Sequence, residues 1–311
     1  MRLTGIGECM VELSRDAGSH YLQGFAGDVF NACYYYAALS PADGGATFIS
    51  ALGDDSFSTE LLDFCREVQV DAQCTRETGS TLGLYLIQRD ARGDRQFSYW
   101  RDAAPARRMI GNLSATQRQQ VESAQLLLLS GVTLAILDDA QRETLRQLVG
   151  AMRRRGGLLA FDPNYRAALW ESVDAARHWI DIFYALADIA FPGLDDERAL
   201  FGVTTTPLDI LGRAPLAAVP EVVVKAGENT VHGRIHGTHF RTTCAPVPCI
   251  VDTTAAGDAF NAAYLVARIR HLSPQVCAAY AARVAAAVIG QRGAIVDAAL
   301  LPKLEARVST E

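Results

Sequence analysis

The stretch Asp252-Thr253-Thr254-Ala255-Ala256-Gly257-Asp258-Ala259-Phe260 follows a short apolar run and opens a long apolar segment, a pattern that predicts a strand, a tight turn and a helix. The first turn of that helix would present unpaired N–H groups and the positive end of its dipole, which suit a phosphate or another developing anion. Asp258 adds one carboxylate beside this anion site. Taken alone, the stretch is explained as well by a structural turn with an Asp or Thr cap.

Outward from this stretch, short apolar runs alternate with helical patterns. Strands are predicted at residues 3–13, 47–52, 126–129, 158–161, 189–191 and 222–224, with helices between most of them, such as 137–155. Buried strands separated by helices favour an α/β fold with a mostly parallel central sheet covered by helices on both faces.

Polar residues follow several of these strands at the point where each strand ends. These residues are Asp162, Asn164, Arg166, Glu197, Lys225 and Gly227, together with the turn 252–258. Each group alone is better explained as a helix cap or a solvated loop. Because open α/β sheets bind ligands beyond the carboxyl ends of their strands, the shared position indicates a ligand site.

Residues 81–101 have a different pattern, in which apolar and aromatic residues alternate. A turn at 91–94 separates two runs, and Phe97, Tyr99 and Arg101 fall on one face of the second run. The pattern predicts a β-hairpin with a polar and aromatic face. That face is either buried for structural reasons or used to contact a ligand or partner.

Composition excludes several classes of protein. The 311 residues carry a formal net charge of −6, without a basic tail, so we expect no nucleic-acid partner. The seven cysteines lack metal-binding spacing and are expected to be reduced core residues of a cytoplasmic protein. Because no apolar run approaches about 18 residues, we expect neither a membrane span nor export.

The opening stretch resembles the Asp-Thr-x-Gly-Ala-Gly-Asp motif of the ribokinase-like (PfkB) carbohydrate kinases, with Ala255 in place of the first Gly. The resemblance implies that Asp258 is the catalytic base and that the N–H groups of Ala255, Ala256 and Gly257 form an anion hole. Residues 24–31 resemble the family's Gly-Gly-Asp…Asn element, with Ala26 replacing one Gly. This implies sugar contacts by Gly27, Asp28 and Asn31.

The resemblance also implies an architecture and cofactors. We expect one ribokinase-like domain over residues 1–311, with a small β-sheet lid built from about 11–30 and 76–105 that covers the sugar and pairs two copies in a homodimer. ATP and Mg²⁺ are the expected cofactors, and K⁺ is expected near Asp252 and 291–294. The family's Asn-x-x-Glu element has Leu194 here in place of Asn, which leaves Glu197 as the expected Mg²⁺ ligand. The residues expected to bind ATP are Asn164, Lys225, Gly227 and Gly257.

The expected substrate depends on charge. Arg101 and Arg166 would both point into the site, and two guanidinium groups suit a carboxylate. With Tyr85 and Tyr99 facing the sugar, the chain resembles the branch of the family that phosphorylates 2-keto-3-deoxygluconate at its C6 hydroxyl, with Asp258 contacting that hydroxyl. Alternatives are a kinase of fructose or 5-dehydro-2-deoxygluconate, or a sugar-acid sensor that has lost catalysis.

Overall fold

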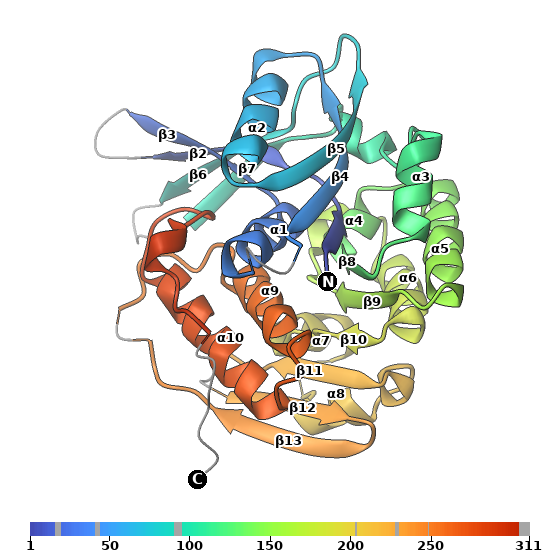
Figure 1. Ribbon diagram of the computed structural model, residues 1–311, viewed down its shortest axis with the longest axis vertical. Helices are drawn as coiled ribbons and strands as arrows, with labels where there is room; N and C mark the ends of the chain where they lie inside the picture. The colour runs from blue at the N-terminus through green and yellow to red at the C-terminus, as the bar shows by residue number, and fades with distance from the viewer. Residues whose placement is uncertain are drawn as a thin grey trace.

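The computed structural model describes residues 1–15, 20–40, 44–89, 95–202, 204–227, 230–247 and 249–304. Among these residues a nine-stranded sheet runs through the molecule in the order β13-β12-β11-β10-β9-β8-β1-β4-β5 (Figure 1). All neighbours pair in parallel except β11–β12 and β12–β13. The strands are β1 (Leu3–Ile6), β4 (Ala46–Gly53), β5 (Val70–Glu77), β8 (Leu126–Ser130), β9 (Leu158–Asp162), β10 (Ile189–Ala190), β11 (Glu221–Lys225), β12 (Thr230–Ile235) and β13 (Thr238–Thr243).

A second, four-stranded sheet lies at one end of the large sheet (Figure 1). Its order is β3-β2-β6-β7, and its strands are β2 (Met10–Arg15), β3 (Tyr21–Ala26), β6 (Leu84–Arg89) and β7 (Arg95–Trp100). Both parts of the chain expected to form a lid therefore meet in one sheet. The hairpin turn expected at 91–94 lies outside the described residues.

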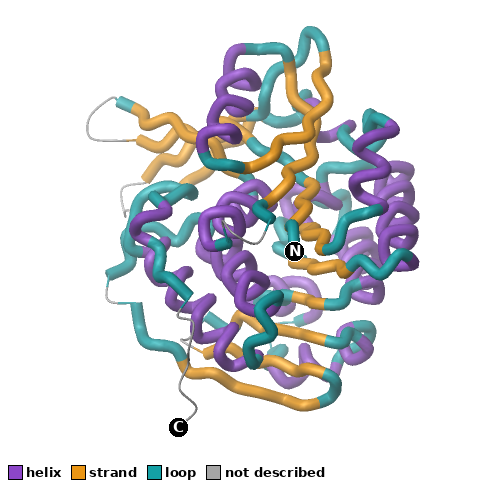
Figure 2. The backbone as a smooth tube through the Cα atoms, viewed as in Figure 1, coloured by secondary structure: helices purple, strands orange, loops and turns teal. Residues whose placement is uncertain are grey.

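Helices cover both faces of the large sheet, which lies between two helical layers (Figure 2). One layer contains α1 (Asp28–Leu39), α2 (Ser56–Glu67), α9 (Ala256–Arg268) and α10 (Pro274–Ile289). The other contains α3 (Ala115–Glu122), α4 (Gly131–Ala135), α5 (Asp139–Arg154), α6 (Val173–Leu186), α7 (Leu194–Phe201) and α8 (Pro207–Gly212).

The central strand β8 shows why this sequence forms a sheet buried on both faces. Leu126 and Leu128 join the hydrophobic core under α1 and α9, whereas Leu127 and Leu129 join the core under α5 and α6. Successive side chains of a strand point to opposite faces, so a continuous apolar run fills both cores at once. The predicted α/β class is confirmed.

Several local predictions differ from the structure. The apolar run before Asp252 forms no strand among the described residues 244–247 and 249–251, and it contains Pro248, whose nitrogen carries no hydrogen to donate to a sheet. Residues 3–13 do not form one strand, because the chain leaves the large sheet after β1 and enters the small sheet at β2, with 7–9 as the crossing. The edge strand β5 was not predicted, since its half-buried, polar sequence lacks the apolar run of the other strands. Cysteines are also not uniformly internal: Cys9, Cys33, Cys65 and Cys277 are buried, whereas Cys249 is exposed.

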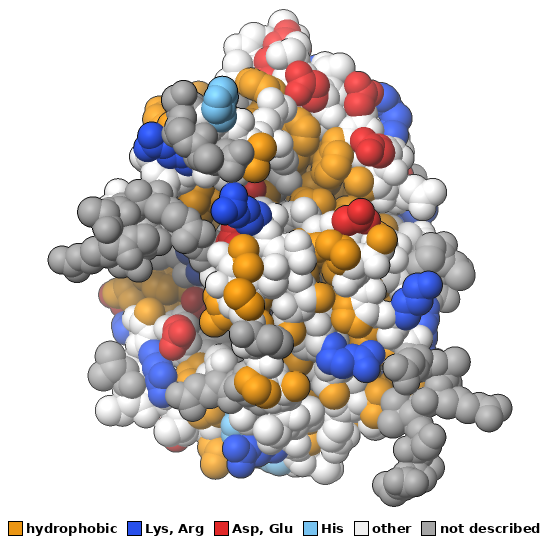
Figure 3. Space-filling view, turned by 90° about the vertical axis from the view of Figure 1, so that its left-hand side faces the viewer, with side chains coloured by type: hydrophobic (Ala, Val, Ile, Leu, Met, Phe, Trp, Pro, Cys, Tyr) orange, Lys and Arg blue, Asp and Glu red, His pale blue; other side chains and the backbone are white. Residues whose placement is uncertain are grey.

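The surface agrees with the composition. On the face drawn in Figure 3, the described Lys and Arg side chains are scattered among hydrophobic and acidic ones, and do not form a continuous basic stripe. Within the part of the chain that the structure describes, each helix is too short or too polar to cross a membrane.

Candidate active site

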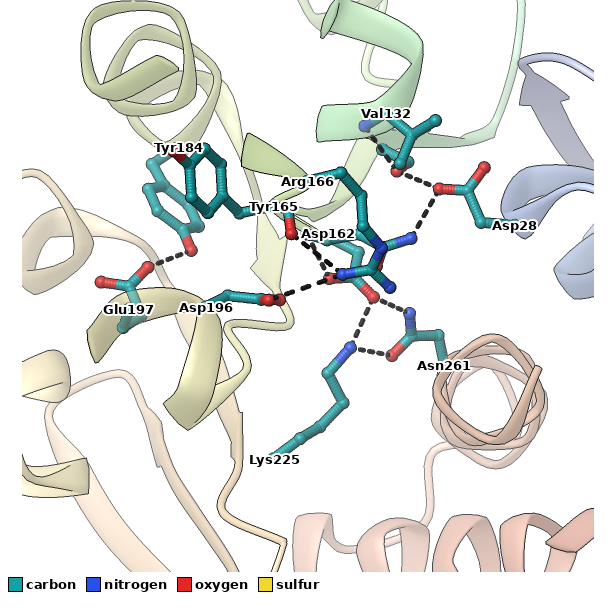
Figure 4. Close-up of polar contacts among 12 residues, drawn as sticks. Asp28, Val132, Asp162, Tyr165, Arg166, Tyr184, Asp196, Glu197, Lys225 and Asn261 are labelled. Carbon is teal, nitrogen blue, oxygen red and sulfur yellow. Dashed lines mark hydrogen bonds and ion pairs between the residues drawn. The ribbon is translucent and has the colours of Figure 1, made fainter. Parts of the chain in front are cut away.

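Polar side chains converge where β8, β9 and β11 end and where α1 and α9 begin (Figure 4). A pocket at this point is lined by Asp28, Val29, Ala32, Leu128, Leu129, Ser130, Asp162, Asp258 and Asn261. The carboxyl edge of the sheet, which the sequence indicated as a ligand site, is therefore where these residues meet.

Asp258 lies in the first turn of α9, and its side chain is oriented by α1. Asn31 Nδ2 donates a hydrogen bond of 2.8 Å to Asp258 Oδ2, while Asn31 Oδ1 accepts one of 3.3 Å from the Gly27 N–H. Burial, and after it the negative charge of Asp28, raises the pKa of Asp258 to about 7, although the hydrogen bond from Asn31 opposes this shift. A carboxyl group with such a pKa can exchange a proton near neutral pH.

Asp28 is held by two groups from the sheet. Asn164 Nδ2 donates to Asp28 Oδ2 at 2.8 Å, and the Ser130 hydroxyl donates to the same oxygen. Asn164, which we expected on the ATP side, therefore contacts the predicted sugar-binding residue Asp28. Its left-handed backbone, with φ of 33°, turns its side chain toward α1.

A second group of polar side chains lies beside Asp258 and consists of Lys225, Asp162 and Asn261. The Lys225 ammonium and the Asn261 amide both donate to Asp162 Oδ2, and Lys225 also lies 3.5 Å from Asn261 Oδ1. A Cβ atom on Gly257 would stand only 3.8 Å from Lys225 Nζ, which places this cation at the start of α9. Lys225 can therefore neutralise an anion bound at that helix terminus.

The turn before α9 has the geometry of an anion site. Ala255 adopts a left-handed conformation with φ of 60°, at the position where the family motif has Gly. Among the described residues no side chain caps α9, so the N–H groups of Gly257 and Asp258 in its first turn have no side-chain acceptor, whereas the Ala256 N–H donates to the Thr253 carbonyl oxygen at 3.4 Å. Non-Gly residues are uncommon in this conformation, and such outliers cluster at functional sites.

Gly27 and Gly227 flank the site for different reasons. A Cβ atom at Gly27 would lie 1.9 Å from the carbonyl oxygen of Glu8, so only Gly allows α1 to start this close to the crossing between the two sheets. Gly227 follows β11 with φ of 80°, a conformation that favours Gly. Its role toward ATP stays a prediction.

The small sheet faces the start of α9. Met10, Ala26, Tyr85 and Ile87 pack with Ala294, and Ala255 contacts this cluster. Tyr85 is buried and donates its hydroxyl hydrogen to Glu12, so this hydroxyl already has an internal partner. Tyr99 stacks on Tyr85, with ring centroids 5.8 Å apart, and is 51% exposed, so of the two rings it is the one accessible to a ligand.

Both candidate arginines carry internal carboxylate partners, which the sequence did not indicate. Arg101 is buried in an ion pair with Glu8, which is also buried, and its guanidinium lies 5.9 Å from the Tyr99 ring centroid. Arg166 is 56% exposed and lies 3.7 Å from Asp196. Contact of Arg101 and Arg166 with a substrate carboxylate therefore stays a prediction, and it would require these arginines to share or exchange their present partners.

Glu197 does not point into the site. Its side chain is fully buried, accepts from the Tyr184 hydroxyl at 2.7 Å and pairs with Arg213 at 3.1 Å. Successive helical residues point about 100° apart, so the preceding Asp196 faces the site instead. Figure 4 shows Asp196 directed at Arg166 while Glu197 turns toward Tyr184. In this geometry Glu197 is engaged by Tyr184 and Arg213, so its role as a Mg²⁺ ligand stays a prediction that the site geometry does not support.

Sequence reasoning also missed contributors to the site. Asn261 lies three residues after Asp258 on α9, a spacing that places both on one helix face and was available from the sequence. Glu197 lies three residues from both Leu194 and Leu200, all three buried, and this stripe could have marked it as internal. The Glu8–Arg101 pair, in contrast, joins positions far apart in the chain and had no local signal.

The carboxylates of the site fit a Mg²⁺ ion that is shared with nucleotide phosphates, rather than one bound by protein side chains alone. Burial and the nearby charge of Asp162 raise the pKa of Asp196 to about 6, although the charges of Lys225 and Arg166 oppose this shift. Within the described ranges no cluster of three or more His, Cys, Asp or Glu side chains could hold a metal. Mg²⁺ commonly binds one or two carboxylates and completes its shell with phosphate and water.

Comparison with known proteins agrees with this geometry. Residues 2–299 match the model of the pfkB family carbohydrate kinases. The chain belongs to this family. It is 38% identical to a 2-dehydro-3-deoxygluconokinase of Escherichia coli over 97% of this chain and 99% of that protein. It is 39% identical to one from Dickeya dadantii, over 96% of this chain and 97% of that protein.

Solved structures of pfkB kinases share the fold. A fructokinase double mutant from Vibrio cholerae, solved with fructose, ADP and a potassium ion, superposes with a TM-score of 0.82 at 22% identity, covering 96% of each chain. At this identity the likeness concerns the fold alone.

Proposed function

We propose that this pfkB-family enzyme transfers the γ-phosphoryl group of ATP to the C6 hydroxyl of 2-keto-3-deoxygluconate, the compound also called 2-dehydro-3-deoxygluconate. The observation that carries the proposal is the position of Asp258, a carboxylate beside the uncapped start of α9 and hydrogen-bonded to Asn31. The curated relatives that are 38% and 39% identical and carry the name 2-dehydro-3-deoxygluconokinase support the choice of sugar acid.

In the proposed reaction, Asp258 accepts the proton of the C6 hydroxyl as the hydroxyl oxygen attacks the γ-phosphorus, while the bond from that phosphorus to the β–γ bridging oxygen breaks and ADP leaves. Because its pKa is raised to about 7, the Asp258 carboxylate is basic enough to accept a proton near neutral pH. Asn31 holds the carboxylate in place, and Asp28 is positioned by Ser130 and Asn164 to accept from a sugar hydroxyl. Positioning of this kind supplies much of the catalytic effect in phosphoryl transfer.

The phosphate groups require neutralisation. The N–H groups at Ala255, Ala256 and Gly257 would stabilise the transferred phosphoryl group, and Lys225 adds a positive charge at the same helix terminus. Mg²⁺, held through Asp196 and Asp162 together with the nucleotide phosphates, would supply further neutralisation of charge. A K⁺ ion near Asp252 and a lid-mediated homodimer are proposals from the family resemblance, and a cytoplasmic location is a proposal from the cysteine pattern.

A substrate comparison tests the proposal. The release of ADP would be measured with MgATP and, in turn, 2-keto-3-deoxygluconate, fructose, 5-dehydro-2-deoxygluconate and gluconate, and the product would be identified by phosphorus-to-carbon coupling in NMR spectra. We expect a kcat/KM for 2-keto-3-deoxygluconate well above that for the other sugars, with phosphate on C6. Preferred turnover of fructose would contradict the substrate but preserve the reaction, and binding of the sugar acid without any turnover would indicate a sensor.

A further inference from the structure

The cations around the site are already paired. Arg101 is bound to Glu8, Lys225 to Asp162 and Arg166 to Asp196. Asp28 and Asp258 add negative charge beside them. An anionic substrate entering this site would therefore meet a net negative surrounding, unless one cation exchanges its partner.

The three pairs differ in how readily they can exchange. Arg101 and Glu8 are 6% and 3% exposed, and breaking a buried pair is strongly destabilising because it leaves an uncompensated charge. The Lys225–Asp162 pair is further bound by Asn261. In contrast, Arg166 is 56% exposed, its 3.7 Å contact with Asp196 is longer than a normal hydrogen bond, and its 2.9 Å hydrogen bond goes to an uncharged group, the Tyr165 carbonyl. Arg166 is the cation that can be released at low cost.

Arg166 also lies between the two sides of the site. Its guanidinium contacts Asp196 at the start of α7 (Figure 4). In the proposed function, this is the side of the phosphates and Mg²⁺. The positive charges of Arg101 and Arg166 both act on the phenol of Tyr99, which places Arg166 within electrostatic range of the small sheet. A small reorientation of the Arg166 side chain would move its guanidinium from Asp196 to a substrate group near the small sheet.

We propose that Asp196 is a positioning residue that holds Arg166 away from the sugar acid until a magnesium–nucleotide complex takes over its carboxylate. Arg166 then becomes available to the substrate carboxylate, so that nucleotide and sugar acid bind with positive coupling. This inference rests on the proposed function. Because coupling is reciprocal, the sugar acid should tighten binding of the magnesium–nucleotide complex by the same factor.

The sign of the effect separates this account from simple electrostatics. The complex of Mg²⁺ with a nucleoside triphosphate is net negative, so its field alone would weaken binding of a second anion. Tighter binding of the sugar acid requires that a positive charge become available. Since exposed ion pairs contribute little, the gain should be about two- to five-fold in Kd.

The test measures binding rather than turnover. Titration calorimetry would give the Kd of 2-keto-3-deoxygluconate for the free protein and for the protein saturated with Mg²⁺ and a non-hydrolysable ATP analogue. In the wild type we expect about two- to five-fold tighter binding with the complex. Asp196→Asn should bind 2-keto-3-deoxygluconate with this lower Kd even without nucleotide, and the magnesium–nucleotide complex should not lower its Kd further.

Two controls isolate the contact. Asp195→Asn removes the same charge from the neighbouring residue, whose side chain is 99% exposed and pairs with Arg198, so it should behave as the wild type. The uncharged amide of the sugar acid should show no gain in either protein. If Asp196→Asn fails to fold, the wild type alone still tests the proposal. Its Kd for 2-keto-3-deoxygluconate would be measured with the nucleotide analogue in the absence and in the presence of Mg²⁺, because only the magnesium complex should tighten binding.

Several results would overturn the inference. Equal Kd values with and without the magnesium complex, unchanged or weaker binding in Asp196→Asn, or the same gain in Asp195→Asn would each exclude this role for Asp196 while leaving the proposed substrate intact. Failure of the sugar acid to bind under any condition would instead reject the proposed substrate, and the inference with it.

Discussion

The raised pKa of Asp258 predicts that the wild-type carboxyl destabilises the fold at neutral and alkaline pH. Unfolded Asp has a pKa of about 3.9, whereas Asp258 is shifted to about 7 by burial and by Asp28. The protein therefore has no penalty below about pH 4, gains one as the pH rises from 4 to 7, and carries the full penalty above 7. Three units correspond to about 4 kcal/mol as an upper bound.

The perturbation is Asp258→Asn, whose amide oxygen can still accept the hydrogen bond from Asn31. At pH 8 the variant should be about 2 to 4 kcal/mol more stable than the wild type. With an unfolding entropy of about 0.65 kcal/mol/K for a chain of 311 residues, this raises the melting temperature by about 3 to 6 °C.

Differential scanning calorimetry at pH 5 and pH 8, at one scan rate, is the assay. Asp195→Asn is the control, since this exposed carboxylate should change stability by less than about 0.5 kcal/mol at either pH. The stabilisation by Asp258→Asn should shrink toward zero on acidification. A variant that is no more stable than the wild type at pH 8, or a gain that does not depend on pH, would refute the electrostatic reasoning.

Three further predictions follow from local geometry. Ala255→Gly should relieve about 1 to 2 kcal/mol of strain from the left-handed backbone conformation. Ala256→Gly, at the first helical position, should instead cost about 0.5 to 1 kcal/mol. Thermal unfolding should therefore show Ala255→Gly as clearly the more stable variant, and equal melting temperatures would contradict the strain at Ala255. Glu197→Ala leaves the buried Tyr184 hydroxyl without its acceptor, while Arg213 keeps Asp181 as a partner, so the melting temperature should fall by an amount equivalent to about 1 to 3 kcal/mol. A selective rise in the KM for MgATP without lost stability would instead favour a direct Mg²⁺ role. Asn31→Ala removes the hydrogen bond that opposes protonation of Asp258, so the apparent pKa of the acid limb in the pH profile of kcat/KM should rise by about one pH unit. An unchanged acid limb would show that this hydrogen bond does not affect the pKa of Asp258.

The fold was largely accessible from sequence because its signals are local. The four leucines of β8 fill both cores, and the helix predicted at 137–155 is observed as α5, capped by the Asp138 side chain. The break at 7–9 was missed because both flanking segments are apolar and β-like, and only the pairing of β2 with β3 and β6 separates them.

The candidate site was predictable in its location but not in its pairings. Asp258 and Lys225 were expected at the edge of the sheet, and the family resemblance implied that Asp28 and Asn31 contact the sugar. The structure brings these four residues together. Whether Asp196 or Glu197 faces the site depends on the rotation of α7, which Tyr184 and Arg213 determine from distant parts of the chain. Contacts of this kind have no local sequence signal.

The most direct test of the central claim is the single-turnover rate of Asp258→Asn with saturating MgATP and 2-keto-3-deoxygluconate, measured together with the Kd of each substrate. If Asp258 is the catalytic base, the rate should fall by about 10² to 10⁴-fold while both substrates still bind with Kd values close to those of the wild type. A rate within ten-fold of the wild type would contradict the assignment of Asp258 as the base.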